Sequence, residues 1–253
     1  MNAALAALVF TPALAVGSFL NVVVARLPEK RSVVHPKSAC PGCEAELAWY
    51  DNVPLVSYLV LRGRCRSCRE PISARYPAVE LATALLVAGC FLRFGLSREA
   101  FVGSFFCAVL VALSAIDTER RILPDRIVLP ATVVVLAAQI ALAPDRALEW
   151  VAASLGAALF LFLALLAYPR GMGMGDVKLA LLLGAGLGRY VMVGLMIGML
   201  AALLPAVVLL ARHGTKARKM AIPFGPFLAF GAIVAFFFGE QLLDAYLGVF
   251  FQR

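Results

Sequence analysis

Long apolar runs recur along almost the whole chain, and polar residues gather in short stretches between them. About 20 helical residues cross the hydrocarbon core of a bilayer, so a run near 18 apolar residues predicts a membrane-spanning helix. Several glycines near residue 186 make the boundary between two neighbouring runs uncertain, so the count of runs is eight, or seven if these two are one. The pattern predicts an all-α polytopic membrane protein with about eight transmembrane helices, near 3–25, 78–94, 100–117, 127–143, 150–168, 177–188, 190–211 and 225–250.

Composition agrees with this interpretation. The 253 residues are 62% hydrophobic and 15% charged, with a mean hydropathy of +0.91. A soluble domain averages about 45–50% apolar and about 25% charged residues. These values argue against a mainly water-soluble domain. The net charge of +8 needs no nucleic-acid partner, because cytoplasmic loops that face anionic lipid carry such a charge.

The distribution of Lys and Arg predicts the topology. If the N-terminus lies outside the cytoplasm, the inside segments hold 18 of the 23 basic residues and the outside segments hold five. Basic loops stay in the cytoplasm. The first run has no basic residue before it and is followed by Arg26 and Lys30, so we interpret it as an anchor and not as a cleaved signal peptide.

One soluble-looking segment interrupts the membrane helices. We therefore expect three parts: a first transmembrane helix at 1–26, a cytoplasmic loop at 27–77, and a helical membrane domain at 78–253. A segment of about 50 residues rarely forms a stable hydrophobic core without a bound metal or a disulfide.

The loop carries two C-x-x-C pairs separated by 21 residues. Thiols in the cytoplasm stay reduced, and four thiolates at this spacing are typical of a tetrahedral zinc site. Four cysteines leave no open position for catalysis, so we expect a structural Zn²⁺, with redox chemistry as the alternative. The neighbouring Arg64, Arg66 and Arg69 would offset the thiolate charge. The expected ligands are Cys40, Cys43, Cys65 and Cys68, whereas Cys90 and Cys107 fall in apolar spans and are expected to be buried packing residues.

Two aspartates stand at the edges of membrane spans, where a charge is costly and usually functional. Asp117 ends one apolar run, and Asp176 follows the glycine-rich stretch 171–175. Both are expected near the cytoplasmic end of a helix and could share one cleft. Paired carboxylates suit water-mediated peptide hydrolysis, because one takes a proton from water while the other donates one.

Each aspartate also has a structural interpretation. Asp117 could be the last residue of a helix just outside the lipid, and Asp176 could cap the helix that follows it. Asp125 is expected in the turn after Pro124 or as the cap of the next helix. Lys178 could tune Asp176 or simply meet the membrane interface.

In their order and spacing, these motifs resemble the bacterial prepilin peptidases, also called type IV leader peptidases. The resemblance covers nearly the whole chain. It is carried by the two C-x-x-C pairs, by Asp117 with Leu123-Pro-Asp125, and by Gly173-Met-Gly175-Asp176-Val-Lys178. It also includes Gly17-Ser-Phe-Leu-Asn21, Asp51-Asn-Val-Pro-Leu-Val-Ser57, Arg75-Tyr-Pro-Ala-Val-Glu80 and Ile222-Pro-Phe-Gly-Pro226.

The resemblance implies a bifunctional enzyme of the bacterial inner membrane, and the Lys and Arg distribution predicts that its N-terminus is periplasmic. Such an enzyme removes the basic leader of type IV prepilins and type II secretion pseudopilins on the cytoplasmic side, and then methylates the new N-terminal residue with S-adenosylmethionine. By motif, the aspartic protease residues are Asp117 and Asp176, and Asp125 is not catalytic. The cysteine loop is implied to serve methylation.

The site of the methyl donor is not evident from the sequence. Asn21, Glu80 and the stretch 51–57 are weak candidates, and polar packing or turn formation explains each of them as well. Glu80 itself is expected in the first turn of its helix, where an acid suits the helix dipole. The alternative functions are an ion- or proton-coupled transporter that uses the intramembrane aspartates, a membrane thiol oxidoreductase, and a non-enzymatic assembly factor.

Overall fold

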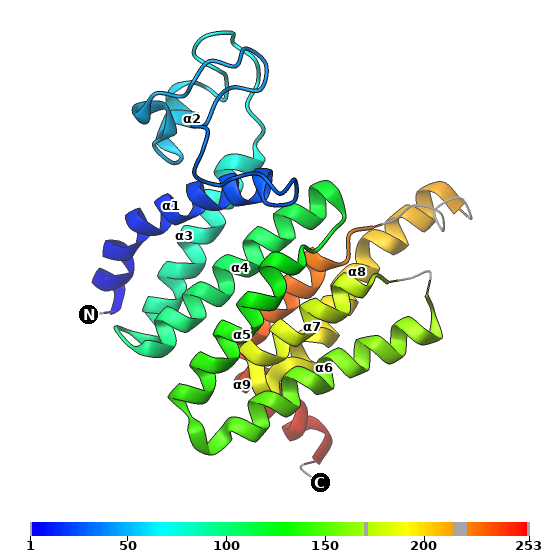
Figure 1. Ribbon diagram of the computed structural model, residues 1–253. Helices are drawn as coiled ribbons and strands as arrows, with labels where there is room; N and C mark the ends of the chain where they lie inside the picture. The colour runs from blue at the N-terminus through cyan, green and yellow to red at the C-terminus, as the bar shows by residue number, and fades with distance from the viewer. Residues whose placement is uncertain (1, 170–171, 215–221, 252–253) are drawn as a thin grey trace. The chain divides into compact units, whose positions relative to one another are not determined.

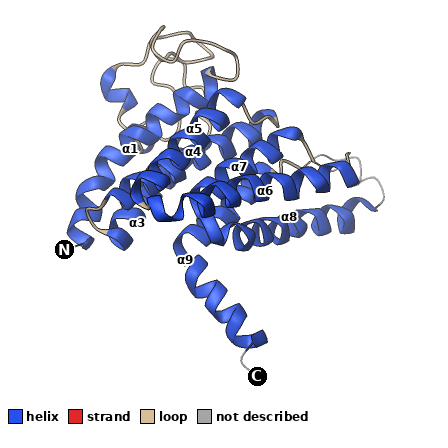
Figure 2. Cartoon of the chain, turned by 60° about the horizontal axis from the view of Figure 1, so that its bottom comes forward, coloured by secondary structure: helices blue, strands red, loops and turns tan. Residues whose placement is uncertain are grey.

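The computed structural model describes residues 2–169, 172–214 and 222–251 (Figure 1). Over these ranges the chain is helical and has no β-strand; two isolated bridges lie in the cysteine loop (Figure 2). The expected all-α class is therefore confirmed.

Every predicted apolar run matches one helix, with at most one residue of the run outside it. The long helices are α1 (Asn2–Arg26), α3 (Arg75–Phe94), α4 (Arg98–Arg120), α5 (Asp125–Leu142), α6 (Ala147–Ala167), α7 (Met174–Leu187), α8 (Val191–His213) and α9 (Gly225–Phe251). Within the described residues, seven segments are long and apolar enough to span a membrane. The number is seven because α7 has only 14 residues and is counted with α8, across the short turn Gly188–Tyr190.

The chain divides into two compact units, Met1–Ile116 and Asp117–Arg253, and the boundary falls inside α4. In the first unit α1 packs along α3 (Figure 1). Their backbones approach closely at Gly17, where a Cβ would lie 2.6 Å from the Cα of Glu80. Small residues permit such contacts between membrane helices. The loop between these helices contains the short helices η1 (Trp49–Asn52) and α2 (Val56–Val60).

In the second unit α7 is the central helix. It contacts α5, α6, α8 and α9, and most of its residues are buried. Ser154 Oγ of α6 donates to Leu181 O of α7 at 2.7 Å, and Gly184 of α7 lies directly against the backbone of Ala153. These contacts pack the middle and the end of α7 closely against α6; Asp176 lies one to two turns before them, at the start of α7.

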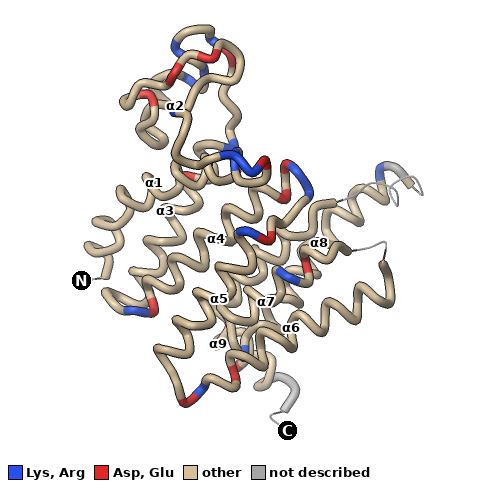
Figure 3. The backbone as a smooth tube through the Cα atoms, in the orientation of Figure 1, with Lys and Arg blue, Asp and Glu red and all other residues tan. Residues whose placement is uncertain are grey.

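Charged residues occupy the helix ends and the loops, while the middle of each long helix is almost free of them (Figure 3). This distribution is the one that a bilayer imposes on helices that cross it. The chain is a multi-pass membrane protein.

Candidate functional site

Asp117 lies in the last turn of α4 and is buried. Its Oδ2 accepts a hydrogen bond from the backbone N–H of Gly225, the first residue of α9, at 2.9 Å. A Cβ at Gly225 would lie 2.8 Å from the same oxygen, so only glycine leaves the space for this contact. The sequence pointed to Asp117 and marked Gly225 as part of the motif 222–226, but it did not indicate that the two residues, 108 positions apart, would be in contact.

Asp176 is the third residue of α7 and is also buried. Its Oδ2 accepts from the N–H of Gly173 at 3.0 Å, and its own N–H donates to Gly173 O at 3.1 Å. The side chain therefore satisfies one of the unpaired N–H groups at the start of the helix, but the N-cap residue is Gly173, so the interpretation of Asp176 as the N-cap is wrong. Gly171, the first glycine of this stretch, falls outside the described residues.

The structure brings these two carboxyls into one site. They interact electrostatically, although 59 positions separate them in the chain. Each uses one carboxylate oxygen to accept from a glycine N–H, and its other oxygen has no hydrogen-bond partner among the described residues. Each carboxyl is therefore oriented through one oxygen, and its other oxygen remains available to a water molecule.

The turn between α4 and α5 is fastened to α7 by two further contacts. Lys178 Nζ donates to both oxygens of Asp125 at 2.8 Å, and a Cβ at Gly175 would lie 3.1 Å from Leu123 Cβ. Asp125 is the first residue of α5, and Lys178 binds it rather than Asp176. These contacts join the turn that follows Asp117 to the helix that carries Asp176, and the sequence did not predict the pairing of Lys178 with Asp125.

The four cysteines of the loop form one cluster. Cys40 Sγ lies 3.8 Å from Cys68 Sγ, Cys43 Sγ lies 4.0 Å from Cys65 Sγ, and all four sulfurs lie within 4.8 Å of one another. Sulfurs at about 2.3 Å from a tetrahedral zinc ion would be about 3.8 Å apart. The geometry and the donor set are compatible with zinc. Cys90 and Cys107 are buried elsewhere, as expected.

The two halves of the cluster are built alike. In each, the N–H of the residue after the second cysteine, Glu44 or Arg69, donates to the carbonyl of the first cysteine, and that residue has a positive φ of 57° or 65°. Backbone N–H groups of Cys68 and Ser67 donate to the Cys65 sulfur and lower its pKa to about 7. The backbone N–H of Glu70 likewise acts to lower the pKa of Cys68, but burial and the neighbouring thiols raise that pKa to about 12, so in the absence of metal the negative charge is concentrated on Cys65.

The loop arginines do not all serve the thiolates. Arg66 forms a bidentate pair with Asp51, with contacts of 2.6–3.1 Å, and its guanidinium lies 5.3 Å from the centre of the Tyr50 ring. The expected offset of thiolate charge by Arg66 is therefore replaced in large part by its pairing with Asp51.

The weak candidates for the methyl-donor site gather between α1, α3 and the loop. Glu80 Oε2 accepts from Leu55 N–H at 2.9 Å, and Asn21 Nδ2 donates to Tyr76 O at 3.0 Å. Glu80 is the sixth residue of α3 and is buried, so the prediction of a first-turn position was wrong. The Glu80 carboxylate accepts the N–H of Leu55, a residue with a φ of +59°, and does not interact with the start of the helix dipole.

Comparisons with known proteins agree with the geometry. The profile of the bacterial peptidase A24 N-terminal domain matches residues 12–94, and that of the type IV leader peptidase family matches residues 104–211. No solved structure matches the chain.

Three similar proteins carry the name prepilin leader peptidase/N-methyltransferase. The protein from Burkholderia pseudomallei is 38% identical, over 89% of this chain and 83% of its own. The one from Pseudomonas aeruginosa is 37% identical, over 92% and 90%, and the one from Bacillus subtilis is 34% identical, over 95% and 97%. Site geometry, family profiles and near full-length similarity lead to one conclusion: the chain belongs to the type IV leader peptidase family.

Proposed function

We propose that the chain is a bifunctional enzyme of the bacterial inner membrane that removes the leader peptide of prepilins and then methylates the new N-terminus. The observation that carries the peptidase half is the pair of buried carboxyls, Asp117 and Asp176, which interact at the ends of two helices. The names of the relatives carry the methylation half.

The proposed hydrolysis uses the two aspartates on one water molecule. One carboxylate takes a proton from the water while the water oxygen attacks the scissile carbonyl carbon. The other carboxyl, which is protonated, donates a proton to the carbonyl oxygen. When the C–N bond breaks, the proton taken from the water passes to the leaving amine. The N–H groups of Gly225 and Gly173 hold the two carboxyls in orientation throughout.

The proposed substrates follow from this site and the membrane helices. A prepilin or a type II secretion pseudopilin has an apolar helix that fits the bilayer and a basic leader beside it. Such a helix could enter from the bilayer and bring the scissile bond to the aspartates at the cytoplasmic boundary. This route requires the N-terminus of the chain to be periplasmic and the 27–77 loop to be cytoplasmic, as the Lys and Arg distribution predicts.

We assign the zinc ion to Cys40, Cys43, Cys65 and Cys68, in a structural role. Four thiolates leave no open coordination position, so the ion would supply stability to a loop that is too short to build a core. S-adenosylmethionine, the donor that the family resemblance implies, would supply the methyl group. No residue of the chain is assigned to it.

One incubation tests both activities. Purified full-length chain in liposomes is mixed with a synthetic prepilin and S-adenosylmethionine, and the intact mass of the products is measured. We expect loss of the leader and a further gain of one methyl group on the mature chain. An unchanged substrate would contradict the peptidase assignment, and a cleaved but unmethylated product would contradict the second activity.

Removal of one ligand tests the zinc assignment. We expect Cys43→Ser to lower bound zinc well below one ion per chain and to impair methylation at least as much as cleavage. Cys90→Ser, which changes a cysteine outside the cluster, is the matched control and should retain the metal. Wild-type protein that contains no zinc would refute the four-thiolate site.

The transporter alternative finds no support in the comparisons. It predicts aspartate-dependent ion flux in liposomes and no cleavage of any prepilin. The same reconstituted preparation therefore separates it from the peptidase.

A further inference from the structure

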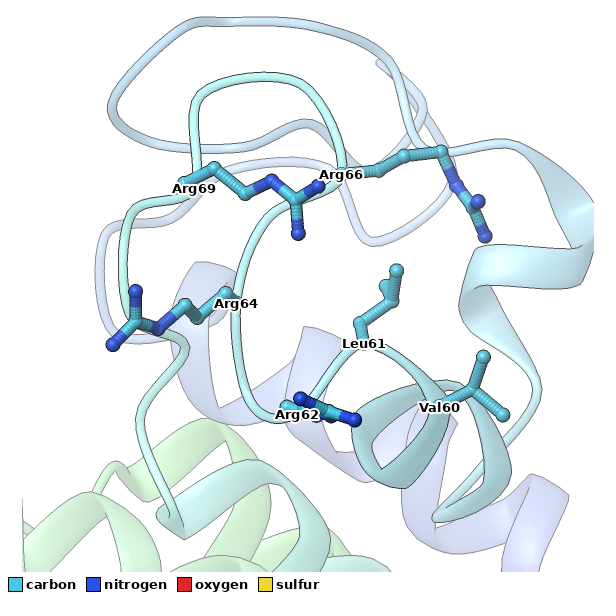
Figure 4. Close-up of a pocket in the computed structure, with 6 residues that line it drawn as sticks. All are labelled: Val60, Leu61, Arg62, Arg64, Arg66 and Arg69. Carbon is cyan, nitrogen blue, oxygen red and sulfur yellow. The ribbon is translucent and has the colours of Figure 1, made fainter.

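An open pocket of about 750 Å³ lies beside the cysteine cluster and is lined by four arginines and two apolar residues (Figure 4). Arg66 is neutralised by Asp51. The guanidinium groups of Arg62, Arg64 and Arg69 have no hydrogen-bond or ion-pair partner in the part of the chain that the structure describes. The acid that follows Arg69, Glu70, packs against Gly42 and does not line the pocket. Four thiolates around a zinc ion would carry a net charge of about −2, which these three guanidinium groups exceed, so the pocket keeps a net positive charge.

This pocket lies next to the ends of two membrane helices. The short helix α2 begins at Val56, and the residue before it, Leu55, donates its N–H to Glu80 in the second turn of α3 at 2.9 Å. Six residues of helix rise only about 9 Å, so this contact places the start of α2 close to the end of the α3 span. Val60 and Leu61, at the end of α2, line the pocket. The pocket consequently lies near the level of the lipid headgroups.

The side chains around the pocket are unusually apolar for a loop in water. Leu59 and Val60 are 73% and 70% exposed, and Trp49 of η1 is 82% exposed. The Trp49 and Tyr50 rings pack edge to face, and the Arg66 guanidinium lies over the Tyr50 ring in a cation–π contact. Tryptophan and tyrosine are enriched at membrane interfaces, and arginines beside exposed apolar side chains are typical of segments that lie on anionic lipid.

From these observations we infer that the arginine pocket binds the phosphate headgroup of an anionic phospholipid, with the exposed side chains of η1 and α2 resting on the bilayer. The volume suits a headgroup, since small-molecule sites usually measure about 300–1,000 Å³. The proposed enzymatic substrates are poor occupants, because a basic leader and S-adenosylmethionine, whose sulfonium and ammonium outweigh its carboxylate, both carry a net positive charge. The lipid contact would hold the cysteine loop against the membrane.

Fluorescence quenching in liposomes tests this inference. The chain has two tryptophans, so Trp150→Phe leaves Trp49 as the only one. This full-length variant is reconstituted with brominated phosphatidylglycerol or, separately, with brominated phosphatidylcholine at the same mole fraction. We expect the anionic lipid to quench Trp49 about threefold more strongly, because each basic residue near a membrane surface attracts anionic lipid.

Two triple variants show whether the pocket is responsible. Arg62→Gln with Arg64→Gln and Arg69→Gln should abolish the preference for phosphatidylglycerol. Lys30→Gln with Arg31→Gln and Lys37→Gln removes the same charge from the same loop outside the pocket and should preserve it. Retained zinc in both variants shows that the loop is still folded.

Four results would overturn the inference. Equal quenching by the two lipids would mean apolar contact without an anion site, and no quenching by either would mean that the loop is off the membrane. Equal loss in the two triple variants would mean attraction by charge alone. Loss of the preference on addition of inorganic phosphate at constant ionic strength would mean a site for free anions.

Discussion

At Asp117 and Asp176 the carboxyl groups are held by backbone N–H groups of glycines rather than by other side chains. Gly225 donates to Asp117, and Gly173 donates to Asp176. A backbone donor fixes the direction of a carboxylate without adding a titratable neighbour. Glycine is needed at residue 225 because a Cβ there would meet the carboxylate it serves.

Substitution at Gly225 should therefore damage catalysis more than stability. We expect Gly225→Ala to lower cleavage about 10- to 100-fold, because a Cβ 2.8 Å from Asp117 Oδ2 must displace that carboxyl. The measurement is the rate of prepilin cleavage by protein that inserts normally. Gly156→Ala, where a Cβ would meet nothing within 4 Å, is the matched control. Equal rates for the two variants would contradict this role for Gly225.

The ion pair of Lys178 with Asp125 offers a test by charge exchange. Both side chains are partly exposed, and such pairs contribute about 0.2–1 kcal/mol. We expect Lys178→Asp or Asp125→Lys alone to slow cleavage by about twofold to fivefold. The double exchange should recover most of the lost rate. If the double variant is as slow as the product of the two single effects, or slower, the pair does not position the site.

At the level of helices, the contact of Glu80 with Leu55 ties the cysteine loop to the membrane helices. Glu80→Ala leaves the Leu55 N–H without its acceptor, a loss of about 1–3 kcal/mol. We expect faster proteolysis of the 27–77 loop and a greater loss of methylation than of cleavage. Glu80→Gln keeps an acceptor oxygen and should be milder, and Glu99→Ala, at an exposed carboxylate, is the control. Unchanged proteolysis in Glu80→Ala would contradict the tie.

The elements that the sequence could predict are those with a local signal. The apolar runs predicted every long helix, because the bilayer demands such runs wherever the chain crosses it. The C-x-x-C spacing predicted the cluster, since two such pairs in one short loop are typical of a metal site. The role of α7 as the central helix, with Gly184 against Ala153, had no local signal.

The same distinction explains the site. Asp117 and Asp176 were evident because acids at the edge of a membrane span are rare. Their partners were not, because Gly225 and the pairing of Lys178 with Asp125 depend on how distant segments pack. Glu80 was misplaced by a turn because α3 begins at Arg75, before its apolar run.

For the whole molecule, the distribution of basic residues predicts the orientation in the membrane. We expect a cysteine introduced as Asn52→Cys to react with a membrane-impermeant maleimide only after the cytoplasmic side is opened. Asp145→Cys, in the turn between α5 and α6, should react from the periplasmic side in intact cells. Both positions are exposed, and labelling of both from one side would contradict the topology.

The central claim is that Asp117 and Asp176 act together on one water molecule. Its most direct test is the rate of prepilin cleavage, followed by intact mass, for liposomes that contain wild-type protein, Asp117→Asn, Asp176→Asn or the control Asp145→Asn. Loss of either carboxylate should lower the rate by about 10²–10⁴-fold, because each is needed for proton transfer, while the control keeps the wild-type rate. Substantial cleavage by either site variant, in protein that is inserted and folded, would contradict the account.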